Sequence, residues 1–80
     1  MASTPAYLEI VDFFASGTTP QSVIEFQPSA AMRERALLLL EAAKLGELTP
    51  EQDSELEYLT ELEHILRMAK ARARQILEAA

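Results

Sequence analysis

The sequence feature that most constrains the fold is its C-terminal stretch, residues 49–80, which contains nothing that interrupts a helix. Neither glycine nor proline occurs between Glu51 and Ala80. The start, Thr49-Pro50-Glu51-Gln52, is typical of a helix N-terminus, because threonine caps a free amide, proline suits the first position and glutamine reaches back to the cap. Such a helix of about 28 residues extends about 42 Å. A domain of 80 residues is only about 30 Å across, so part of the helix is expected to need a partner.

Three shorter helices are expected before the long one, each with a start and a stop signal. These signals are Thr4-Pro5 and Gly17 for the first, Thr19-Pro20 and Pro28 for the second, and Ser29 and Gly46 for the third. The third helix is expected over residues 30–45, and the short connection of residues 46–49 places it antiparallel to the long helix. The sequence therefore predicts an all-α fold over one domain, residues 1–80. It has about four helices: two short ones, then an antiparallel hairpin with one long C-terminal helix.

Both helices of the expected hairpin carry broad apolar faces. On the third helix, the residues predicted to face the core are Met32, Ala36, Leu37, Leu39, Leu40 and Ala43. On the long helix, a heptad seam with alternating spacings of three and four residues consists of Leu59, Leu62, Leu66, Ala69, Ala73 and Ile76. Most helical stripes of this kind pack on the rest of their own domain, which is the simplest interpretation for the N-terminal half of the seam. The C-terminal half is expected to extend beyond the earlier helices, and its two alanines leave room for close helix approach.

Charge is segregated along the long helix. Seven acidic residues and no basic ones lie between Glu47 and Glu63, whereas four basic residues and no acidic ones lie between Arg67 and Arg74. The helix dipole favours this order but acts only over the terminal turns, and both runs are longer than that. Two copies paired antiparallel would set acidic ends against basic ends. A partner-binding surface is therefore predicted from Leu66, Arg67, Lys70, Ala73, Arg74 and Ile76, serving a homodimer, another protein or both.

Composition excludes several classes of function. With no cysteine the chain has no disulfide and no thiolate site, and the cytoplasm is the expected location. The first residues lack the pattern of a signal peptide, and the longest apolar run, residues 36–40, is too short to cross a bilayer. The net charge of −6 argues against direct nucleic-acid binding and favours a basic protein as partner.

Residues for catalysis or metal binding are sparse. Glu61 and His64 form a Glu-x-x-His pair, a spacing used in di-iron bundles. With Leu62 and Leu66 on the seam, however, this pair falls on the outward side, whereas such sites lie inside bundles. The histidine also lacks the second positioned group that acid-base chemistry requires. No enzymatic activity, cofactor or metal is therefore predicted.

Several segments support a family resemblance. They are Ile24-Glu25-Phe26-Gln27-Pro28-Ser29, Leu48-Thr49-Pro50-Glu51, Glu55-Leu56 and Leu62-Glu63-His64-Ile65-Leu66-Arg67-Met68-Ala69-Lys70-Ala71-Arg72-Ala73. Over roughly residues 20 to 77 the chain resembles small all-helical bacterial proteins, frequent in cyanobacteria, that are similar to antitoxin-like proteins encoded beside PIN-type or HNH-type nucleases. The most specific part is Leu-Glu-His-x-x-Arg-x-x-Lys-x-Arg. The segment before the helices departs from common antitoxins, since it has no ribbon-helix-helix or looped-hinge strand, which argues against operator binding.

Two hypotheses of function follow. The first is a protein-interaction module, antitoxin-like, that neutralises a neighbouring nuclease, as the resemblance implies. The alternative is a structural homo-oligomer whose long helices associate with no toxin involved. A gene for a small basic nuclease beside this one would favour the first.

Overall fold

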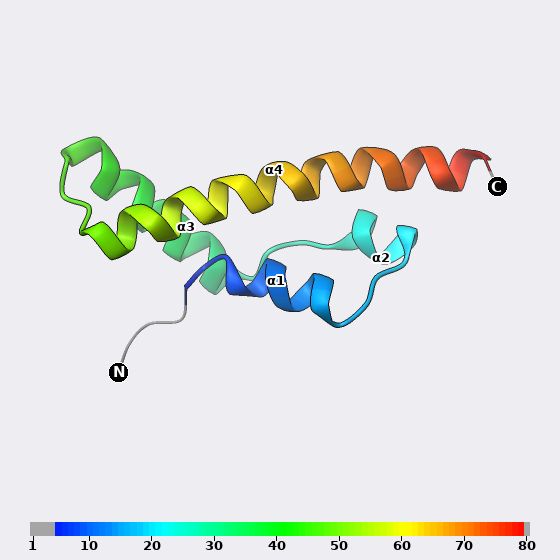
Figure 1. Ribbon diagram of the computed structural model, residues 1–80, viewed down its shortest axis with the longest axis horizontal. Helices are drawn as coiled ribbons and strands as arrows, with labels where there is room; N and C mark the ends of the chain where they lie inside the picture. The colour runs from blue at the N-terminus through cyan, green and yellow to red at the C-terminus, as the bar shows by residue number, and fades with distance from the viewer. Residues whose placement is uncertain (1–4, 80) are drawn as a thin grey trace.

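The computed structural model describes residues 5–79, and within this range the chain is entirely helical apart from its turns and connections (Figure 1). The helices are α1 (Leu8–Ala15), α2 (Pro20–Glu25), α3 (Ala30–Leu45) and α4 (Pro50–Ala79). At 30 residues, α4 runs almost the whole 48 Å length of a molecule that is 25 Å by 19 Å in its other dimensions. The predicted all-α fold with two short helices, a hairpin and a long C-terminal helix is confirmed.

The capping signals of α2, α3 and α4 act as the sequence predicts. At the start of α4, the Thr49 hydroxyl accepts a hydrogen bond from the Gln52 amide at 3.1 Å, and the Gln52 side chain accepts one from the Thr49 amide at 3.0 Å. Ser29 likewise caps α3. Gly17 and Gly46 both have positive φ angles, 89° and 70°, which L-residues adopt only with strain. Local chemistry therefore determines where α2, α3 and α4 begin and where α3 ends.

The first helix begins later than predicted. Thr4 lies outside the described residues, and α1 starts at Leu8 after a turn in which the Leu8 amide donates to the Pro5 carbonyl. Tyr7, the N-cap residue of α1, makes no side-chain capping hydrogen bond. Instead the Ala6 amide donates to Glu55 of α4 at 2.9 Å. The start of α1 is thus attached to the long helix, which local sequence signals do not reveal.

The core lies along the inner side of α4 and has two parts. The first, where α1 and α3 meet α4, is built around the buried side chains Ala6, Ile10, Met32 and Leu59. The second, where α2 meets α4, is built around Val23, Leu66 and Ala73, with half-buried aromatic side chains packed against it. One aromatic pair, Phe13 and Phe26, has ring centroids 4.4 Å apart. The six-residue α2 thereby covers the helix as far as Ala73, and only the last turns extend past it (Figure 1).

The apolar face predicted for α3 is only partly buried. Met32 and Leu39 are in the core, but Leu37 is 60% exposed, Leu40 is 47% exposed and Ala43 is also exposed. The reason is the geometry of the hairpin: α3 and α4 run in opposite directions but cross at an angle (Figure 1). Crossing helices bury only the side chains near their line of contact. Part of the apolar surface of α3 therefore remains open.

Candidate interaction surface

A groove lies between α3 and α4, on the side where the two helices diverge. It consists of two adjoining hollows of about 220 and 250 Å³ that share Pro28, Met32 and Glu63. The apolar side chains that line this groove are Ile10, Phe26, Pro28, Met32, Ala36, Leu37, Leu40 and Leu66. The exposed Leu37 and Leu40 belong to this wall, so the groove presents apolar side chains to the surroundings.

Charged side chains border the groove. Glu63, Arg67 and Lys70 come from α4, and Arg33 comes from α3. The Arg33 guanidinium donates to the Pro28 carbonyl at 2.9 Å, which fixes it across the segment that enters α3. An apolar floor with a charged rim is the usual anatomy of a protein-binding surface.

Lys70 has a role inside the chain. Its ammonium donates to the backbone carbonyls of Ile24, at 3.3 Å, and Phe26, at 2.6 Å. These carbonyls lie at the C-terminal end of α2, where helix carbonyls lack partners and carry partial negative charge. Lys70 therefore attaches the end of α2 to α4 and is half-buried there. From the sequence alone, Lys70 is expected only to be a charged surface residue.

The other residues predicted to bind a partner divide into two groups. Leu66 and Ala73 are only 8% and 4% exposed, because α2 and its neighbouring aromatic side chains cover them. Ala73 is therefore not open to a partner in this arrangement, and Leu66 contributes only its small exposed part to the lining of the groove. Arg67 and Arg74 are exposed, as is Ile76 at 43%. The expectation that the earlier helices leave the C-terminal half of the seam uncovered therefore holds only past Ala73.

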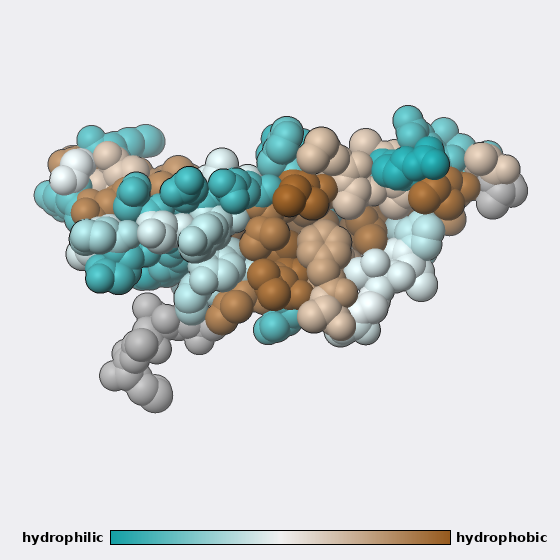
Figure 2. Space-filling view, in the orientation of Figure 1, coloured by the Kyte–Doolittle hydropathy of each residue, from teal (hydrophilic) through white to brown (hydrophobic). Residues whose placement is uncertain are grey.

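A second row of side chains runs along the outside of α4. This outer row consists of Tyr58, Glu61, Ile65, Met68, Arg72 and Gln75, again at spacings of three and four residues. Its apolar members are about half exposed: 50% for Tyr58, 47% for Ile65 and 53% for Met68. In Figure 2, apolar side chains gather over the middle of α4 and the adjoining α1. Sequence reasoning missed this row because Glu61 and Arg72 interrupt its apolar pattern, although the heptad spacing is present.

An ion pair connects three segments beneath these surfaces. The buried Glu55 carboxylate accepts two hydrogen bonds from the Arg35 guanidinium, at 2.8 and 3.0 Å, in addition to the one from the Ala6 amide. The hydrogen bonds from Arg35 hold the pKa of Glu55 below its ordinary value. Burial of the carboxylate opposes this shift, and the hydrogen bond from the Ala6 amide adds to it. Glu55 therefore joins α3 and the start of α1 to α4. In the sequence it is only one member of an acidic run.

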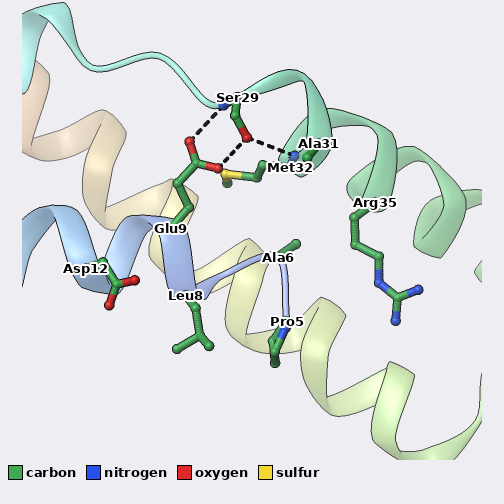
Figure 3. Close-up of a pocket in the computed structure, with 9 residues that line it drawn as sticks. All are labelled: Pro5, Ala6, Leu8, Glu9, Asp12, Ser29, Ala31, Met32 and Arg35. Atoms are coloured by element: carbon green, nitrogen blue, oxygen red, sulfur yellow. Dashed lines mark hydrogen bonds between the residues drawn. The ribbon is translucent and has the colours of Figure 1, made fainter. Parts of the chain in front are cut away.

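A hollow between α1 and the start of α3 offers no set of catalytic groups. Figure 3 shows Glu9 bonded to Ser29, whose amide and hydroxyl donate to the carboxylate at 2.8 and 2.7 Å. Asp12 lies apart from this pair and Arg35 extends away from it (Figure 3). The Glu9 carboxylate is thus engaged in holding α1 against the cap of α3, where a negative charge is favourable at a helix N-terminus.

Glu61 and His64 are both exposed on α4. Among residues 5–79, no group of three or more histidine, aspartate or glutamate side chains is placed to hold a metal ion. None of the helices in the same range combines the length and apolar character that a membrane span requires. Comparison with protein-family models, with curated proteins and with solved structures found no match.

Proposed function

We propose that this chain is a protein-interaction module that binds an apolar segment of another protein in the groove between α3 and α4. The observation that carries the proposal is the exposure of Leu37 and Leu40 in the wall of that groove. Each large apolar side chain that is removed from water contributes about 1.5–3 kcal/mol, so leaving both exposed forgoes stability that a partner restores. Contiguous apolar surface with a polar rim is characteristic of binding sites.

The partner that fits best is a basic protein. The chain has a net charge of −6, and the N-terminal half of α4 carries an acidic run that extends to Glu63, the acidic member of a rim that also holds Arg33, Arg67 and Lys70. Opposite charge on the partner would accelerate association and orient it. The resemblance to antitoxin-like proteins implies a small nuclease encoded nearby, and such an enzyme has basic surface for its nucleic-acid substrate. Neutralisation of that nuclease is the biological role that we propose.

The test is co-purification of the chain with the product of the neighbouring gene, followed by a nuclease assay on the complex. We expect the unaltered chain to bind and to inhibit. The double variant Leu37→Glu/Leu40→Glu should lose both properties, since it places charge on the apolar wall. Leu45→Glu is the matched control, because Leu45 is on the same helix and 70% exposed but does not line the groove. Absence of binding, or equal binding by the two variants, would contradict the proposal.

A further inference from the structure

The outer row of α4 is a second surface with a different composition from the groove. Its three apolar members are half exposed, and one acidic and one basic residue, Glu61 and Arg72, flank the central Ile65 and Met68. Labelled as a heptad, Tyr58, Ile65 and Arg72 take the first apolar position, and Glu61, Met68 and Gln75 take the second. The row therefore has the spacing of a coiled-coil seam over about 26 Å of helix. None of the helices of residues 5–79 covers it fully, as these exposures show.

We propose that the outer row is the interface of an antiparallel homodimer. The charge pattern identifies a second copy as the occupant. When two copies of α4 are placed antiparallel about a two-fold axis midway between Leu66 and Arg67, each first position faces a second position of the other copy. Glu61 then faces Arg72 of the second copy, and Arg72 faces its Glu61.

The apolar residues of the row match in the same register. Ile65 of each copy faces Met68 of the other, so both form the centre of the interface. Tyr58 faces Gln75 at each end, where its hydroxyl and the amide are both polar. Charged pairs therefore flank an apolar centre, an arrangement in which the same patch is complementary to itself.

A parallel arrangement of the same row is unfavourable. It would place Glu61 against Glu61 and Arg72 against Arg72, and like charges that face each other across a helix interface repel. Along the whole helix, antiparallel pairing also sets the acidic half of one copy beside the basic half of the other. Charge thus selects the orientation, while the apolar centre supplies the affinity.

This dimer does not rest on the proposed function. The outer row and the groove use different side chains: Leu37, Leu40 and Arg67 line the groove and none of them belongs to the row. A dimer built this way leaves both grooves open for a partner. The centre of this interface is formed by Ile65 and Met68. The sequence predicts Leu66 and Ala73 in this role, but α2 covers both.

Charge exchange at Glu61 and Arg72 tests the interface by sedimentation equilibrium at high micromolar concentration. The unaltered chain should sediment at twice its mass of 8.9 kDa. Glu61→Arg alone and Arg72→Glu alone each place like charges opposite one another, and each should shift the chain to monomer. An equimolar mixture of the two single variants should return to dimer, because each then meets opposite charge. That recovery also shows that neither variant has lost its fold.

The double variant Glu61→Arg/Arg72→Glu tests whether these two positions face each other across the interface. In the antiparallel register the exchanged charges face each other again, so the double variant should dimerise like the unaltered chain. In a parallel register each single variant would only replace one pair of like charges with another and would dimerise as well as the unaltered chain; that result, or a monomeric double variant, would overturn the proposal. The proposal is equally wrong if the unaltered chain is a monomer. Glu57→Arg is the control, since Glu57 is exposed on α4 but outside the row, and it should leave the dimer intact.

Discussion

Removing the Glu55 carboxylate should destabilise the fold more than any other single loss of charge on α4. The carboxylate accepts bonds from Arg35 of α3 and from the amide of Ala6 before α1, so one side chain joins three segments. In Glu55→Ala, the Ala6 amide loses its partner in a buried position, and Arg35 loses the anion that fixes it. The expected change is a lower free energy of unfolding with α4 itself still helical.

The magnitude follows from the environment of the pair. A hydrogen bond to a charged group contributes about 1.5–3 kcal/mol, and such contributions do not add when they share a partner. Arg35 is 23% exposed and regains water when the carboxylate is lost, which reduces the penalty. We therefore expect Glu55→Ala to cost about 2–4 kcal/mol. For a domain of this size that corresponds to a decrease in Tm of at least about 8 °C.

The assay is urea unfolding followed by circular dichroism, at neutral pH and down to about pH 3. Because the folded-state pKa of Glu55 is depressed, its stabilisation is fully present above the unfolded-state pKa of about 4.3. It is lost as the pH falls through the folded-state pKa, since the unfolded chain then binds more protons. The difference between the unaltered chain and Glu55→Ala should therefore shrink in acid.

Glu57→Ala provides the control for this experiment. Glu57 is exposed on the same helix, so its loss should change stability by no more than about 0.5 kcal/mol. If Glu55→Ala and Glu57→Ala were equally stable at neutral pH, the reasoning about the Arg35–Glu55 pair would be refuted. A difference that stayed constant into acid would show that the lost stability does not come from the carboxylate charge.

Three further perturbations test how the helices are held. Lys70→Met removes the ammonium from the Ile24 and Phe26 carbonyls, so the amides of α2 should exchange with solvent about tenfold faster; unchanged exchange would show that the lysine does not hold α2. Gly46→Ala should lower the free energy of unfolding by about 1 kcal/mol. The whole effect comes from the φ of 70°, because an added Cβ meets nothing within 4 Å. Chemical denaturation measures the change, and a stabilised variant would contradict the prediction. Thr49→Ala removes the cap of α4 and should also cost about 1 kcal/mol by the same assay, whereas no loss would mean that water replaces the hydroxyl.

Features that depend on neighbouring residues in the chain are predictable from the sequence. The extent of α4 follows from the Thr49 cap and from the absence of glycine and proline after Pro50. The end of α3 follows from Gly46. These signals act within one helical turn, so no knowledge of the tertiary structure is required.

Features that depend on distant segments are not predictable in this way. Glu55 belongs to a run of acidic residues, and its burial depends on Arg35 and on Ala6, which is 49 positions away. Likewise, the heptad spacing identifies Leu66 and Ala73 as one apolar stripe, but nothing local indicates that α2 covers them. Exposure of Leu37 results from the crossing angle of two helices, which its own side chain does not encode.

Thiol labelling of single-cysteine variants tests the central claim most directly. That claim is that α2 covers the heptad seam of α4 as far as Ala73 and leaves the outer row free for another molecule. The native chain has no cysteine, so each introduced thiol reports only its own position. In dilute solution, Met68→Cys should react rapidly and Ala73→Cys slowly, in keeping with exposures of 53% and 4%. As the protein concentration rises, Met68→Cys should become protected while Ala73→Cys remains unchanged. Rapid labelling of Ala73→Cys, or labelling of Met68→Cys that does not depend on concentration, would contradict the account.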